Sequence, residues 1–104
     1  MLMVKAMADK QFYVYILASR LGGTLYIGVT SRLVQRTYEH RESLAEGFSK
    51  RHGVKRLVYY EACPTAESAI LREKQMKEWR RAWKIELIER ENPNWIDLYP
   101  IITR

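Results

Sequence analysis

Residues 11–29 read QFYVYILASRLGGTLYIGV and contain the two segments that decide the fold. Residues 11–18 and 24–29 are rich in β-branched and aromatic side chains, which favour strands. Between them, SRLGG carries paired glycines, whose freedom to adopt unusual backbone angles suits a turn. This stretch therefore predicts two strands joined as an antiparallel hairpin.

The rest of the chain predicts helices and one further strand. In order, these are a helix over about 32–45, a strand over 55–62, a helix over about 66–79, and further helix over about 80–91 after a kink or short break. Thr30 and Ser31 are suitable N-caps for the first helix, and Asn92-Pro93 ends the last. Since each amphipathic helix needs a face to bury, the order β-β-α-β-α-α predicts an α+β fold, a small three-stranded antiparallel sheet flanked by helices.

Length and composition set the domain organisation. The chain has 104 residues, which suits one domain, expected over residues 11–100 with a poorly ordered segment at residues 1–10. Apolar residues make up 47% of the chain, which argues against disorder. The tail after the last helix contains Trp95, Leu98 and Tyr99, which we expect to pack back onto the body.

Cysteine usage and charge indicate the compartment and the partner. The single cysteine, Cys63, excludes an internal disulfide and fits the reducing cytoplasm, and with two histidines it argues against structural zinc. The sequence contains no apolar span long enough to predict a membrane helix. The net charge of +6 suits nucleic acid, because lysine and arginine release counterions from phosphates, although a merely soluble basic protein would look the same. The candidate contacts are Lys50, Arg51, Lys55 and Arg56.

Glu73 is a carboxylate within a predicted packing face. The apolar residues of that face recur at helical spacing, and they are Ala66, Ala69, Ile70 and Met76. A carboxylate in such a position is costly unless it is paired or binds a metal. Spacing alone favours an ion pair with a nearby lysine or arginine, and metal binding is the alternative.

Arg36 and His40 lie four residues apart, so they share one face of the first predicted helix. The guanidinium of Arg36 suits bidentate contact with a phosphate. The ordinary pKa of histidine lies close to neutrality, so His40 could transfer a proton there. The alternative for such a pair is a solvated helix face.

Three tyrosines, Tyr13, Tyr15 and Tyr26, fall in the predicted hairpin, and their spacing would let Tyr15 and Tyr26 stand across from each other. Gly28, on the same strand face as Tyr26, marks the close approach of another group. Hairpin tyrosines usually serve packing alone. Combined with the arginine–histidine pair and the helix carboxylate, however, they supply what metal-assisted phosphodiester cleavage needs.

These residues resemble the motifs of the GIY-YIG endonuclease superfamily. The first half-motif reads Tyr13-Val14-Tyr15, with Tyr13 where the family name has glycine, and the second reads Tyr26-Ile27-Gly28. TSRLVQRTYEH and SAILREKQMKEWRR resemble the arginine-bearing helix and the metal-site helix of the family. The likeness covers about Phe12 to Leu98 and is nearest to small stand-alone bacterial members that resemble the N-terminal nuclease domain of the excinuclease C subunit.

The resemblance implies a metal-dependent endonuclease that hydrolyses phosphodiester bonds in nucleic acid, expected to be DNA, in a repair- or structure-related role. Tyr15 and Tyr26 would line the site, and one of them would orient or deprotonate the attacking water. Arg36 would contact the scissile phosphate, and Glu73 would bind one Mg²⁺ or Mn²⁺. The role of His40, as base or as phosphate contact, stays open.

The resemblance leaves some positions and alternatives open. Asn92 is the candidate for a late family asparagine, and Asn94 competes with it, while Tyr13 and Gly28 are further candidate site positions. Stand-alone members lack an attached DNA-binding domain, so the alternatives are that this protein cuts weakly, acts on a particular structure, or needs a protein partner that supplies substrate specificity. Other readings are a non-catalytic nucleic-acid-binding module on the same fold, a nuclease subunit that needs a partner, or an interaction protein that buries its tryptophans against another chain.

Overall fold

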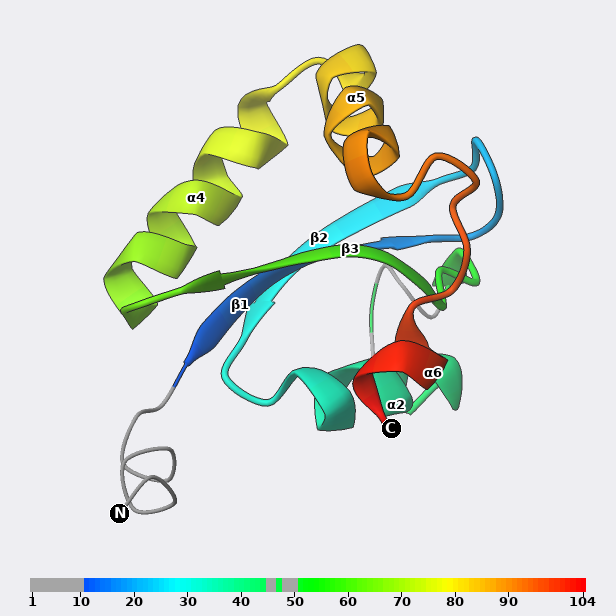
Figure 1. Ribbon diagram of the computed structural model, residues 1–104, viewed down its shortest axis with the longest axis horizontal. Helices are drawn as coiled ribbons and strands as arrows, with labels where there is room; N and C mark the ends of the chain where they lie inside the picture. Colours follow the sequence, from blue (N-terminus) through cyan, green and yellow to red (C-terminus); the bar gives the residue numbers. More distant parts are fainter. Residues whose placement is uncertain (1–10, 45–46, 48–50) are drawn as a thin grey trace.

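Three antiparallel strands in the order β2-β1-β3 form the centre of the computed structural model (Figure 1). The model describes residues 11–44, 47 and 51–104, so the predictions for residues 1–10 and for Lys50 lie outside the described residues. The strands are β1 (Phe12–Ala18), β2 (Leu25–Thr30) and β3 (Arg56–Cys63). β1 pairs antiparallel with β2, which confirms the hairpin, and Gly22 adopts a φ of +69° in its turn.

Helices cover both faces of this sheet. They are α2 (Leu33–Arg41), α4 (Ala66–Glu78), α5 (Arg81–Glu91) and the short α6 (Tyr99–Ile102). In Figure 1, α4 and α5 lie over one face of the sheet, and α2 and α6 lie over the other. The predicted α+β fold is therefore confirmed, with α6 as an element that was not predicted. No helix within the described ranges is both long enough and apolar enough to cross a membrane.

The ends of the helices follow from local chemistry. Thr65 caps α4 reciprocally with Ser68, each hydroxyl accepting a hydrogen bond from the other residue's backbone N–H. Trp79 is extended after the helix, so α5 starts anew at Arg81, and the predicted break is confirmed. At the start of α2 the expected capping is wrong, because Arg32 occupies the N-cap position and the Thr30 hydroxyl accepts from the Arg32 N–H at 3.0 Å.

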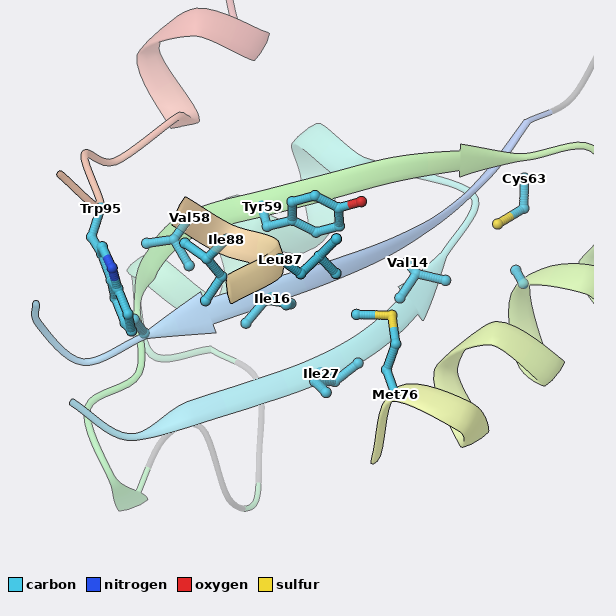
Figure 2. Packing of buried hydrophobic residues seen from close by; sticks show 12 residues of the cluster. Val14, Ile16, Ile27, Val58, Tyr59, Cys63, Met76, Leu87, Ile88 and Trp95 are labelled. Carbon is cyan, nitrogen blue, oxygen red and sulfur yellow. The ribbon is translucent and has the colours of Figure 1, made fainter. Parts of the chain in front are cut away.

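The side chains of β1 alternate between two apolar clusters. Val14, Ile16 and Ala18 pack toward α4 and α5, where Figure 2 shows Met76, Leu87 and Trp95 around them. Trp95 is fully buried, which confirms that the tail packs back onto the body and contradicts its use against a partner chain. On the opposite face, Tyr15 and Leu17 pack with Leu33 and Leu57, and the partly buried Tyr13, Tyr26, Tyr60 and Leu98 surround them.

A register shift in β3 changes which of its side chains face α2. Ile16 pairs with Tyr59 and Leu17 pairs with Leu57, so Val58 is an extra residue in the strand. Leu57 and Tyr60, three residues apart, therefore both join the cluster on the α2 face, although strict alternation would separate them. The shift brings Tyr60 to the same side of the sheet as Tyr13.

The predicted packing face of α4 is wrong in one respect. Ile70 is 45% exposed, whereas Ala69 and Met76 are buried. The helix contacts the sheet along a narrow line, so a residue to one side of that line reaches solvent. Glu73 lies at the margin of the contact rather than in its centre, and 19% of its side chain is exposed.

Candidate active site

Tyr15 of β1 and His40 of α2 form a buried pair between the sheet and that helix. The Tyr15 hydroxyl lies 3.1 Å from Nε2 of His40, and the two residues are 1% and 3% exposed. Tyr26 completes an aromatic group, with its ring centroid 6.3 Å from that of Tyr15 and 5.4 Å from that of His40. The structure thus brings together three of the predicted site residues, from β1, β2 and α2.

Gly28 lies directly opposite Tyr15 in the hairpin. The expectation that Tyr15 and Tyr26 stand across from each other is wrong, because Tyr15 pairs with Gly28 and Tyr26 pairs with Leu17. The two tyrosines are instead diagonal neighbours on one face. A Cβ atom built on Gly28 would lie 2.5 Å from the Tyr15 hydroxyl oxygen and 2.6 Å from Cζ. Glycine therefore allows the Tyr15 side chain to cross β2 and reach the edge of the sheet.

Charges from two helices act on the Tyr15 hydroxyl. Burial, together with smaller effects of the neighbouring Tyr26 and the carboxylate of Glu73, raises the pKa of Tyr15 to about 12. Arg36 opposes this shift through its hydrogen bond and its positive charge. Tyr15 is therefore protonated at neutral pH. Arg36 on α2 and Glu73 on α4 both lie within electrostatic reach of the same hydroxyl.

His40 is a neutral imidazole. Burial, reinforced by the positive charge of Arg36 and opposed by Glu39, lowers the pKa of His40 to about 4. The expectation of a pKa near neutrality is wrong for this side chain, because the interior disfavours its charged form. A neutral His40 can exchange a hydrogen bond with Tyr15, and at neutral pH it is a weak base.

Protonation of His40 should make the stability of the fold depend on pH. The pKa of His40 is about 4 in the folded protein, below its ordinary value of 6.5, so the unfolded chain binds more protons between these values. The contribution of His40 is complete above its unfolded pKa and decreases as pH falls toward the folded one. We expect the free energy of unfolding to fall by about 2 kcal/mol between about pH 7 and about pH 4.5 from this group.

Urea denaturation of the wild type and of His40→Gln at both pH values measures this contribution. The variant lacks the imidazole, so its stability should fall less over the same interval. The pKa values of Glu39 and Glu61 are lowered in the folded state, by bonds to Arg36 and to Arg72 respectively. Their contribution is lost only at lower pH and is present in both proteins. Equal losses in the two proteins would contradict the role of His40.

Arg36 is positioned on α2 and remains open to solvent. Its Nη1 donates to Oε1 of Glu39 at 2.8 Å, and 40% of its side chain is exposed. It lines a small cavity of about 180 Å³ together with Thr30, Arg32, Gln35 and Glu39. The Glu39 contact directs the guanidinium while leaving other N–H donors for an anionic ligand.

Glu73 forms an ion pair at the protein surface. Its Oε2 lies 3.0 Å from Nζ of Lys77, whose side chain is 55% exposed. The ion pair that spacing alone favoured is therefore present, as an i,i+4 pair whose lysine is exposed, a type that contributes little to stability. It explains neither why the carboxylate lies at the margin of the packing face nor its influence on Tyr15.

Glu73 is the one predicted metal ligand, and it offers a single carboxylate. Within residues 11–44, 47 and 51–104, no group of three or more His, Cys, Asp or Glu side chains could hold a metal. That excludes a zinc-type cage within these residues. Mg²⁺ usually keeps several waters and binds through one or two carboxylates plus substrate phosphates, and Glu73 offers such a carboxylate.

Asn92 is built into the fold. It is buried at the end of α5, where its amide donates to the carbonyl oxygens of Val58 at 3.0 Å and Ile96 at 2.9 Å. Its side-chain oxygen accepts from the Ile96 N–H at 3.0 Å. These bonds hold the turn after α5 against β3, and they account for Asn92 without a site role. Asn94 is exposed.

The other predicted positions fall into separate places. Arg51 and Lys55 are exposed before β3 and stay available for a polyanion. Arg56 is partly buried, and its Nη1 donates to the Trp95 carbonyl at 3.0 Å, so part of its guanidinium serves the fold. Tyr13 packs edge-to-face against Tyr60, with ring centroids 6.3 Å apart.

Sequence reasoning did not identify the partners of the two charged site residues. Glu39 follows Arg36 by three residues and Lys77 follows Glu73 by four, spacings that signal contact on a helix. Helical spacing could therefore have found both. Tyr60 could not have been found in this way, because the register shift in β3 decides which way it faces.

One side of this sheet gathers tyrosines, a histidine and an arginine, and the carboxylate of Glu73 also acts on that group. The model of the GIY-YIG catalytic domain matches residues 11–86, so the chain belongs to that family and the membership expected from its motifs is confirmed. A solved structure is also similar, the solution NMR structure of the UPF0213 protein BH0048 from Bacillus halodurans. It is 29% identical, covers 79% of this chain and 86% of its own, and gives a TM-score of 0.50. No curated protein matches the chain.

Proposed function

We propose that the protein is a divalent-metal-dependent endonuclease that hydrolyses phosphodiester bonds in nucleic acid, with DNA as the expected substrate. The observation that carries this proposal is the buried Tyr15–His40 pair. Arg36 on α2 and Glu73 on α4 both influence the pKa of its tyrosine hydroxyl, which belongs to the hairpin. Such a set suits phosphoryl chemistry, in which positive charge must meet the reacting phosphate.

In this proposal the groups open to solvent act on the substrate. Arg36 donates to the non-bridging oxygens of the scissile phosphate and stabilises the charge that develops there. Tyr26 is partly exposed, so its hydroxyl orients the attacking water. Glu73 would hold Mg²⁺ or Mn²⁺, which when bound supplies charge neutralisation and water activation.

Tyr15 and His40 are positioning residues in this scheme. Both are almost completely buried, so they act on a substrate indirectly, through the residues that they contact. The hydrogen bond to His40 holds the Tyr15 hydroxyl, which in turn interacts with Arg36. The pair therefore orients Arg36 and supports the ring of Tyr26 from below. We therefore propose that His40 positions Tyr15 rather than acting as a general base, and its lowered pKa supports this choice.

A panel of end-labelled DNA and RNA substrates tests the function. Single strands, blunt duplexes, nicked duplexes and branched structures are incubated with the full chain and Mg²⁺ or Mn²⁺, with Glu73→Ala in parallel. Metal-dependent cleavage by the wild type but not by the variant is the expected result. Binding without cleavage of any substrate would favour a non-catalytic module. Cleavage only after a cell extract is added would favour a subunit that needs a partner. We also propose that the protein acts in the cytoplasm and that its cleavage serves DNA repair.

Nucleic-acid binding should weaken steeply as salt rises. The chain carries a net charge of +6, and Arg36, Arg51 and Lys55 are available to phosphates. If about three to five phosphates are neutralised, the logarithm of the association constant should fall against that of salt with a slope of about −3 to −5. Titrating a labelled duplex with Glu73→Ala protein from 50 to 200 mM salt should show about 10²- to 10³-fold weaker binding. An affinity unchanged over this range would contradict the electrostatic contacts.

A further inference from the structure

A groove beside the candidate site is lined by aromatic and apolar side chains with a polar rim. Its volume is about 510 Å³. Its lining includes Tyr13, Tyr60, Leu33, Val34, Arg32 and Gln35, and Ile102 of α6 also contributes. Figure 1 shows α2 and α6 together on one side of the sheet. Leu33 is buried and Val34 is exposed, so α2 forms one apolar wall of the groove.

The groove adjoins the cavity that Arg36 lines. Arg32 and Gln35 line both spaces, and the Arg32 guanidinium donates to the Gln35 side-chain oxygen between them. Arg36, one residue after Gln35, lines the second space. A ligand whose phosphate meets Arg36 could therefore place its next group in the groove without a break in contact.

Two tyrosines from different strands make the aromatic part of the groove. Tyr13 stands on β1 and Tyr60 on β3, with ring planes inclined at 69° to each other. Tyr60 faces this side because of the extra residue in β3. Tyr13 occupies the position at which the motif of the family is named for glycine, so its ring stands where that name has no side chain. Its hydroxyl bonds to Gln11 at the surface, and its ring remains half-buried in the groove.

We propose that this groove binds the base of an unpaired nucleotide next to the phosphate contacted by Arg36. The inference rests on the proposed nuclease function and narrows its substrate to nucleic acid with a single-stranded or branched segment. Aromatic rings beside arginines are the chemistry that stacks unpaired bases, since every base has a π-face. Gln35 can bond a base edge, and Arg32 can meet the adjoining phosphate. The net charge of +6 and the adjoining cavity lined by Arg36 favour this polyanion over an apolar peptide.

A base held in a duplex is already paired and stacked, so it would have to leave the helix before it could enter the groove. Short single strands should therefore depend on the groove more than blunt duplexes do. The sugar plays no part in stacking, so DNA and RNA oligonucleotides share this chemistry. Separate DNA and RNA arms of the experiment decide whether the sugar matters.

Fluorescence anisotropy with labelled 8-nucleotide single strands and blunt duplexes, in DNA and RNA versions, tests the inference. All proteins carry Glu73→Ala, so that binding is separated from cutting. Tyr13→Ala removes the stacking ring, and Tyr13→Phe retains it. Val34→Glu adds a negative charge inside the groove, and Tyr38→Glu adds the same charge at another exposed position on α2. Thermal melts identify any variant that fails to fold. The substitutions Val34→Glu and Tyr38→Glu are both on α2, so they leave the residues of the sheet unchanged.

We expect Tyr13→Ala and Val34→Glu to weaken single-strand binding about 5- to 100-fold, the range for loss of a base stack. Tyr13→Phe and Tyr38→Glu should change it less than about twofold, and duplex binding should change little in every variant. Equal weakening for single strands and duplexes would overturn the inference in favour of general phosphate contact. Unchanged single-strand binding would also overturn it. So would variants whose only effect, on size-exclusion chromatography, is the loss of self-association, because the groove would then be an interface between copies of the chain.

The two proposals fail in different ways. If the intact protein cuts nucleic acid in a Glu73-dependent manner while single-strand binding ignores Tyr13, the groove proposal alone is wrong. If the intact protein neither binds nor cuts any probe, the nuclease proposal is wrong and the groove proposal with it. Cleavage confined to blunt duplex would likewise overturn the substrate class and leave the nuclease function in place.

Discussion

Glu73→Ala is expected to reduce metal-dependent cleavage about 10³-fold or more, while the free energy of unfolding stays within about 0.5 kcal/mol of the wild type. The activity would fall because the variant loses charge neutralisation and water activation together. Each of these supplies several kcal/mol to the transition state, and about 1.4 kcal/mol corresponds to a tenfold change in rate.

The free energy of unfolding should be insensitive to Glu73→Ala because of where the carboxylate lies. Its ion-pair partner, Lys77, is 55% exposed, so losing the carboxylate leaves a solvated ammonium group. A truly buried pair would cost about 3–5 kcal/mol when one partner is removed, but an exposed i,i+4 pair is worth only about 0.3–0.5 kcal/mol. Alanine also has the higher intrinsic helix propensity, which offsets part of that loss.

Two control variants sharpen this experiment. Glu78→Ala removes another exposed carboxylate from α4 and should keep full activity. Lys77→Ala breaks the same ion pair but keeps the proposed metal ligand, so it too should remain active. A cleavage assay with Mg²⁺ and a thermal melt on each purified protein give both quantities. Substantial cleavage by well-folded Glu73→Ala protein would refute the proposed mechanism.

Gly28→Ala is expected to destabilise the protein by about 2–4 kcal/mol and to reduce cleavage about 10²-fold. The added methyl group would lie 2.5 Å from the Tyr15 hydroxyl oxygen and 2.6 Å from Cζ. Tyr15 is 1% exposed and bonded to His40, so its ring has little room to move away. Either the ring shifts and loses that hydrogen bond, or the two strands separate locally.

A double-mutant cycle with Tyr15→Leu isolates this contact. Leucine lacks the atoms that the new methyl group would meet, so Gly28→Ala should cost less than about 1 kcal/mol in that background. Urea denaturation of the four proteins measures the coupling free energy. If Gly28→Ala is equally costly in both backgrounds, the requirement for glycine lies elsewhere in β2.

Much of the fold could be predicted because neighbouring residues determine it. The hairpin at residues 11–29 combines strand-forming residues with a glycine turn, and both signals act within a few residues. The start of α4 at Thr65 and the break at Trp79 are likewise local, and the structure agrees with both. The bounds of α2 were less accurate, since its N-cap is Arg32 and its last residue is Arg41.

The candidate site was predicted as a set of residue types rather than as an arrangement. The half-motifs identify the chain as a GIY-YIG domain, and the helical spacing relates Arg36 to His40. The same reasoning gave His40 an ordinary pKa, whereas burial lowers it to about 4. Burial depends on what covers a side chain, and here that cover comes from distant parts of the chain.

The sequence by itself determined the family, the three strands, the main helices and the residue types available for chemistry, because each is encoded in local propensity or in a motif. Tertiary structure alone decided that Tyr15 lies opposite Gly28 rather than Tyr26, since strand register depends on how the hairpin closes. It also decided that Tyr60 joins Tyr13 in a groove, because the extra residue in β3 reverses the facing of that strand. These are long-range pairings, and no short window of residues contains both partners.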